Sequence, residues 1–133
     1  MRRNWMKWLF IGGPTLLLTL FALTFIPHKL FNINPSDVAK IVVFNGNNGK
    51  ETVIRDKEAI HTIVLNLNSV TFKKGKPSFG YMGYHYRITI FDKKDSEQKK
   101  FIMNSSDTIR YNGFFYRTEN ESLIYDYLNE IVK

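Results

Sequence analysis

Residues 8–26 read WLFIGGPTLLLTLFALTFI, a run of 19 residues without a charged side chain. At about 1.5 Å of rise per helical residue, such a run spans roughly 28 Å, close to the thickness of the hydrocarbon core of a bilayer. Trp5 and Trp8 lie at its N-terminal end, where indole rings favour the headgroup layer. The segment 12–14 (Gly-Gly-Pro) is poor helix sequence in water but is tolerated in lipid. The run therefore predicts a membrane-spanning helix.

Three interpretations of this run compete. A buried core helix is disfavoured, because the rest of the chain is too small to surround an apolar cylinder of this length. A cleaved secretory signal fits the basic N-terminus, but residues 21–26 lack the small-x-small pattern that signal peptidase requires. We favour an uncleaved signal anchor, with residues 1–7 as a basic cytoplasmic N-terminus and residues 8–26 as the transmembrane segment. The C-terminal part of a single-pass protein of the cell membrane is then extracytoplasmic.

The charge of the chain is unevenly distributed. Its formal net charge is +7, from 19 Lys and Arg against 12 Asp and Glu. Arg2, Arg3 and Lys7 precede the apolar run, whereas the chain from Leu30 onward has 15 basic and 12 acidic residues, a net charge of only +3. The high total is therefore no argument for a nucleic-acid partner, and we expect none. The absence of cysteine excludes disulfides, thiolate metal sites and a lipid-modified N-terminal cysteine.

Beyond the membrane segment, residues 27–35 (PHKLFNINP) predict a connector, because their prolines and asparagines oppose a helix. Residues 36–133 then form the expected extracytoplasmic domain. Within it, Asn112-Gly113 is the preferred pair for a type I′ hairpin turn between two strands. Short alternating or β-branched segments predict strands at residues 38–44, 51–54, 70–72, 84–91, 99–104, 108–111 and 114–117.

Two helices complete the expected domain. The first runs from Asp56, a good N-cap, to Asn68. A capping box at residues 118–121 (TENE) predicts the start of the second. The order β-β-α-β-β-β-β-β-α is dominated by hairpins, so we expect an α+β fold with a small antiparallel sheet and two packed helices. The apolar faces of these helices are Ile60, Ile63, Val64 and Leu67, and Leu123, Ile124, Tyr127, Leu128 and Ile131.

Residues 73–83 form the longest expected loop and carry the candidate binding patch. Basic and aromatic side chains together suit anionic polymers, sugar rings or a partner protein. The competing interpretation is a solvated lysine run whose aromatic neighbours fold into the core. The patch consists of Lys73, Lys74, Lys76, Phe79, Tyr81 and Tyr84.

The sequence predicts no catalytic residue, no cofactor and no metal site. Ser78, His85 and Asp92 follow one another along the chain, but no nucleophile elbow accompanies them. His28, His61 and His85 are scattered, and the carboxylates are mostly interleaved with lysines. A small envelope enzyme or inhibitor-like protein, with a site that no motif reveals, is the alternative to a binding module.

Two stretches carry a resemblance to a known family. They are NSVTFKKGKPSFGYMGYHYRITIFDK (residues 68–93) and SDTIRYNGFFYRTENESLIYDYLNEI (residues 106–131). Over about residues 38–131 the chain resembles small extracytoplasmic domains of unassigned function from Gram-positive bacteria, which sit behind a membrane helix or a lipoprotein signal. The resemblance implies location and architecture and transfers no active residue, and without cysteine the helix itself must be the anchor. We therefore expect a non-enzymatic binding or regulatory module that contacts an envelope protein or an anionic wall polymer.

Overall fold

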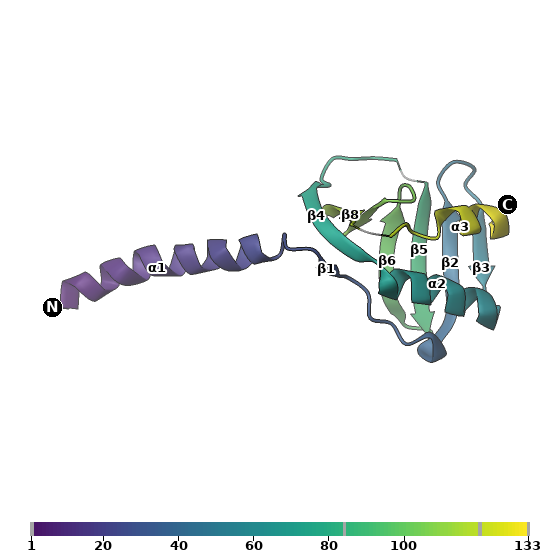
Figure 1. The fold of residues 1–133 in the computed structure, drawn as a ribbon, viewed down its shortest axis with the longest axis horizontal. Coiled ribbons are helices and arrows are strands. Elements are labelled where there is room, and N and C mark those ends of the chain that lie inside the picture. The colour runs from purple at the N-terminus through teal and green to yellow at the C-terminus, as the bar shows by residue number, and fades with distance from the viewer. Residues whose placement is uncertain (1, 84, 120, 133) are drawn as a thin grey trace.

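The protein consists of a long N-terminal helix followed by a separate α+β domain (Figure 1). The structure, a computed structural model, describes residues 2–83, 85–119 and 121–132. The predicted fold class and element order are confirmed, and a short strand and a 3₁₀ helix precede the expected elements. In chain order the elements are α1 (Arg2–Leu23), β1 (His28–Lys29), η1 (Pro35–Asp37), β2 (Val38–Asn45), β3 (Glu51–Ile54), α2 (Lys57–Ser69), β4 (Thr71–Pro77), β5 (Tyr86–Asp92), β6 (Glu97–Met103), β7 (Thr108–Tyr111), β8 (Phe114–Thr118) and α3 (Tyr125–Ile131).

α1 is an apolar helix that the rest of the protein does not cover. Its 22 residues give a length of roughly 33 Å. Among the described residues it is the one helix long and apolar enough to cross a membrane, and none of its most apolar window is buried. The hydroxyls of Thr15 and Thr19 donate to the carbonyls of Ile11 and Thr15 at 2.6 and 2.9 Å, so both are satisfied within the helix. All these properties suit a helix surrounded by lipid.

The domain is built on one antiparallel sheet with the strand order β1-β4-β8-β7-β6-β5-β2-β3. The hairpin of β7 and β8 turns through Asn112 and Gly113, whose φ angles of 49° and 83° confirm the predicted type I′ turn. β1 pairs with the edge of β4 through His28 and Lys29. This short strand places the end of α1 directly beside the sheet.

α2 and α3 lie on the same face of the sheet and enclose a single core (Figure 1). Asp56 caps α2 as predicted, with its carboxylate accepting from the backbone N–H of Ala59 at 3.0 Å. Ile63 on α2 and Leu128 on α3 are completely buried. The opposite face of the sheet carries side chains such as Phe44 and Arg87 and lacks a covering helix among the described residues.

The segment between α1 and η1, expected to be only a connector, contributes to this core. Phe31 is 1% exposed and packs its ring against Phe72 and Phe101, at centroid distances of 5.8 and 4.9 Å. Asn68 at the end of α2 accepts from the Ile33 backbone N–H and donates to its carbonyl, at 2.9 and 2.7 Å. Packing and paired hydrogen bonds therefore hold the chain that leaves α1 against the domain.

Two local expectations are wrong. β4 continues to Pro77, so the lysines expected in a loop belong to a strand. The predicted capping box does not form, because Thr118 ends β8 and α3 begins only at Tyr125. The Asn66 side chain of α2 instead accepts from the backbone N–H of Ile124 at 3.0 Å, so a contact between distant segments replaces the local cap.

The position of α2 gives a direct test of the core. Replacing Ile63 with alanine leaves a cavity under α2, and we expect it to lower the free energy of unfolding by about 2–5 kcal/mol. Leu65 on the same helix is 49% exposed, so Leu65→Ala should change the stability by about 0.5 kcal/mol or less. Urea unfolding of the full chain in detergent micelles, followed by circular dichroism, measures both. Equal losses would contradict this packing.

Candidate binding surface

The structure divides the candidate patch into separate groups. Lys73, Lys74 and Lys76 lie on β4, whose successive side chains point to opposite faces of the sheet. Phe79 lies beyond the end of β4, in the loop toward β5, and Tyr84 lies outside the described residues. The described residues of the patch therefore fall into groups with different contacts.

Lys74 contacts the C-terminal end of α1. Its Nζ lies 4.0 Å from the ring centre of Phe114, and 5.0 and 5.3 Å from those of Phe21 and Phe25. It also donates to Thr24 Oγ1 at 3.2 Å. We call this group of Lys74, Phe21, Thr24, Phe25 and Phe114 the Lys74 clasp. An ammonium over aromatic faces contributes about 0.5–1 kcal/mol at an exposed site. α1 has no basic residue in its last turn, so Lys74 also supplies the cation that a helix C-terminus favours.

Lys76 belongs to a second group that fixes the loop after β4. Its Nζ donates to the Tyr81 hydroxyl at 2.7 Å, and the Tyr81 ring meets Phe115 edge-on at 5.0 Å. Arg110 of β7 donates through Nη1 to the Tyr81 carbonyl and through Nη2 to the Gly83 carbonyl, at 2.8 and 2.6 Å. No sequence pattern marks Arg110 or Phe115 as members of this group, because only strand pairing brings them to the loop.

The loop exposes apolar side chains beside these lysines. Phe79 is 79% exposed and Met82 is 95% exposed, although both belong to types that usually lie inside. The Phe79 ring lies by the Asn112–Gly113 turn, within van der Waals distance of where a Cβ on Gly113 would be. The competing interpretation, with the aromatic residues of the patch folded into the core, is wrong for Phe79. Exposed apolar groups next to cations favour an interaction surface.

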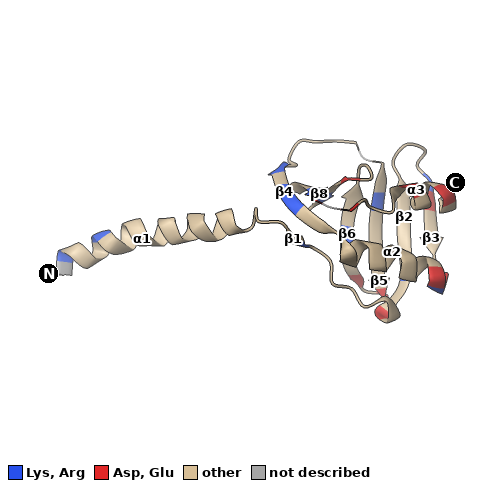
Figure 2. Cartoon of the chain, in the orientation of Figure 1, with Lys and Arg blue, Asp and Glu red and all other residues tan. Residues whose placement is uncertain are grey.

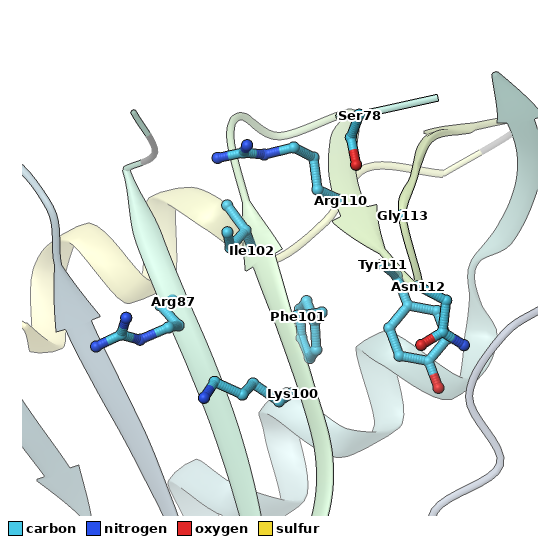
Figure 3. Close-up of a pocket in the computed structure, with 9 residues that line it drawn as sticks. All are labelled: Ser78, Arg87, Lys100, Phe101, Ile102, Arg110, Tyr111, Asn112 and Gly113. Carbon is cyan, nitrogen blue, oxygen red and sulfur yellow. The ribbon is translucent and has the colours of Figure 1, made fainter. Parts of the chain in front are cut away.

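A shallow hollow of about 230 Å³ opens beside this loop (Figure 3). Arg87, Lys100 and Arg110 reach it from β5, β6 and β7, and Ser78 lies at its rim. The guanidinium of Arg87 lies 4.8 Å from the Phe44 ring centre, while that of Arg110 holds the loop. The hollow is lined by cations, so it favours anions, but part of its charge already has a structural role.

His85 and Asp92, two residues considered for catalysis, are separated by the length of β5. His85 directly precedes β5, whereas Asp92 is its last residue and accepts from the backbone N–H groups of Lys94 and Ser96 in a turn. The His85 ring hydrogen-bonds the Tyr125 hydroxyl and stacks on Tyr86 at 4.1 Å. Within residues 2–83, 85–119 and 121–132, no group of three or more His, Asp or Glu could hold a metal ion.

The lysines of β4 lie on the side of the domain that adjoins α1. Figure 2 shows blue bands on β4, beside the end of that helix. Red bands mark η1, the start of α2 and α3, all of which lie away from α1. Neither β4 nor residues 114–117 of β8 contain an acidic residue. The domain therefore presents a cationic strand to whatever surrounds the C-terminal end of α1.

Comparisons of the chain with protein-family models, with curated proteins and with solved structures found no match. Inferences about function therefore start from the contacts of this chain.

A network at the start of β7 gives a pH-dependent prediction. Hydrogen bonds from the Ser105 and Thr108 hydroxyls, at 2.7 and 2.8 Å, lower the pKa of Asp107 below its ordinary value of 3.8, and Arg117 adds a smaller effect. A lowered pKa in the folded state stabilises the fold at pH values above 3.8, and this stabilisation is lost as the pH falls through the folded-state pKa. We expect Asp107→Asn to be less stable than the wild type at neutral pH, and the difference to shrink in acid. Thermal unfolding across the pH range measures it, and a pH-independent difference would contradict it.

The Lys74 clasp predicts how often β1 separates from β4. Lys74→Gln removes the ammonium from the aromatic rings, so the β1–β4 pairing should open about fivefold more often, the equivalent of about 1 kcal/mol. Lys73→Gln makes the same charge change at an exposed position and should alter opening less than about twofold. Hydrogen exchange at His28, Lys29 and Phe72, with the full chain in micelles, measures both. Equal acceleration by the two variants would rule out the clasp.

Proposed function

We propose that the protein is a single-pass, membrane-anchored, extracytoplasmic module that binds an anionic component of the cell envelope and is not an enzyme. Residues 8–26 act as the anchor in the lipid bilayer, and residues 1–7 stay in the cytoplasm. The domain, starting from residue 36, faces outward. This is also what the resemblance to the Gram-positive extracytoplasmic domains implies.

The single observation that carries the anchor is the exposure of α1. A helix of 22 residues whose apolar part is uncovered by the protein is costly in water and stable in a bilayer. Three basic residues precede its apolar run, while Lys29 is the only Lys or Arg within ten residues after it. The positive-inside rule therefore favours a cytoplasmic N-terminus.

The binding role is supported by the side of the domain that adjoins α1. Lys73 and Lys76 are exposed on β4, and Phe79 is exposed just beyond it. Cations with an adjacent aromatic ring suit phosphate-bearing polymers and headgroups. The hollow with Arg87 and Arg110 adds cations on the open face of the sheet. An envelope protein with an acidic surface would use the same features.

Topology tests this proposal. We expect the chain, expressed in a Gram-positive host, to sediment with membranes and to resist extraction by alkaline carbonate. Protease added to protoplasts should digest the domain and spare an epitope placed before Met1. A chain found free in the cytosol, or a protected domain with a digested N-terminal epitope, would overturn the proposal.

A further inference from the structure

The connection between the apolar run and the sheet is very short. Two residues after Ile26, β1 begins, and it pairs antiparallel with β4. β4 therefore runs back toward α1 as it proceeds from Thr71 to Pro77. Lys74 confirms this direction, because its Nζ is 3.2 Å from Thr24, which lies within the last turn of the apolar run. The C-terminal half of β4 thus lies level with the end of the helix.

The depth of this strand follows from the same contacts. The end of an apolar run marks the boundary between hydrocarbon and headgroups. An ammonium that touches Thr24 and lies over Phe21 and Phe25 therefore sits at headgroup depth once α1 is in a bilayer. A lysine ammonium at the boundary between apolar side chains and headgroups has the usual arrangement of cations at a membrane surface.

Other exposed residues at this end of the domain also suit the headgroup layer. Lys73 and Lys76 are exposed on β4, and Phe79 is 79% exposed beside the Asn112–Gly113 turn. That turn follows Tyr111 and precedes Phe114, whose ring is 6.5 Å from that of Phe21 in α1. We call Lys73, Lys74, Lys76 and Phe79 the basic edge. Lysines next to an exposed aromatic ring are typical of surfaces that bind anionic lipid.

We propose that the basic edge docks on the headgroups of anionic phospholipids in the leaflet at the C-terminal end of α1. The Lys73 and Lys76 ammoniums bind lipid phosphates, Lys74 holds the edge against α1, and the Phe79 ring enters the interface. The occupant is lipid of the protein's own membrane because the contacts of Lys74 with α1 leave β4 at the level of the headgroups. This inference rests on the proposed function, since it requires α1 to span the bilayer.

An introduced indole can report this docking. The two tryptophans, Trp5 and Trp8, lie before or at the start of the apolar run and can be replaced by phenylalanine. Phe79→Trp in that background then places the one indole at the basic edge. The full chain is reconstituted in nanodiscs of phosphatidylcholine alone, or with about 30% phosphatidylglycerol, and quenching by lipids brominated near the headgroup is measured.

We expect strong quenching and a blue-shifted emission with phosphatidylglycerol, and weaker effects without it. Lys73→Gln with Lys76→Gln should reduce the docked population about tenfold. The matched control, Lys93→Gln with Lys94→Gln, removes the same charge from exposed positions next to η1 and should leave quenching unchanged. Circular dichroism verifies that both double variants keep the fold.

Each contrary outcome has a distinct meaning. Equal quenching in the two lipid mixtures, or equal losses in the two double variants, would overturn the docking proposal. The emission could instead shift when soluble poly(glycerol phosphate) is added to phosphatidylcholine discs, and stay unshifted in discs that contain phosphatidylglycerol. That result would assign the edge to a wall-type polymer and overturn lipid docking. Protease digestion of residues 8–26 in the same discs would overturn the membrane anchor itself, whereas protection without quenching would overturn only the docking.

Discussion

One physical constraint underlies the proposed function: an apolar helix that the described residues leave uncovered is costly in water and stable in lipid. α1 is about as long as a bilayer's hydrocarbon core is thick, and its threonine hydroxyls are satisfied within the helix. The domain has its own core and does not need α1 for burial. α1 therefore adds nothing to the core of the domain, and its role in the proposed function is that of an anchor.

The connection between α1 and the domain is short and is held in place by contacts on both sides. A flexible tether would let the domain sample a large volume above the membrane. Here Phe31 is packed in the core, Asn68 holds the backbone of Ile33, and Lys74 reaches back to the helix. These contacts, with that of Phe114 to Phe21, hold β4 and the start of β8 beside the C-terminal end of α1.

The helices and the turn that depend on residues close together along the chain could be predicted from the sequence. Periodicity located α2, the Asn112–Gly113 pair located the sharpest hairpin, and the absence of charge over residues 8–26 located α1. Contacts between distant segments were not predictable in this way. The pairing of β1 with β4, the Lys74 clasp and the role of Arg110 join residues that are 27 or more positions apart. The predicted capping box was wrong for the same reason. The Asn66 side chain, from distant α2, accepts from the backbone N–H of Ile124 at the start of α3.

The central claim is that α1 lies in the bilayer and delivers the domain to the membrane surface. The chain has no cysteine, so single cysteines can carry spin labels without background. We would place them by Leu17→Cys, Ile26→Cys and Asn47→Cys and compare the access of oxygen and of a polar nickel chelate. The account predicts high oxygen and low chelate access at position 17, intermediate values at position 26 and free chelate access at position 47. Equal chelate access at positions 17 and 47 would contradict it.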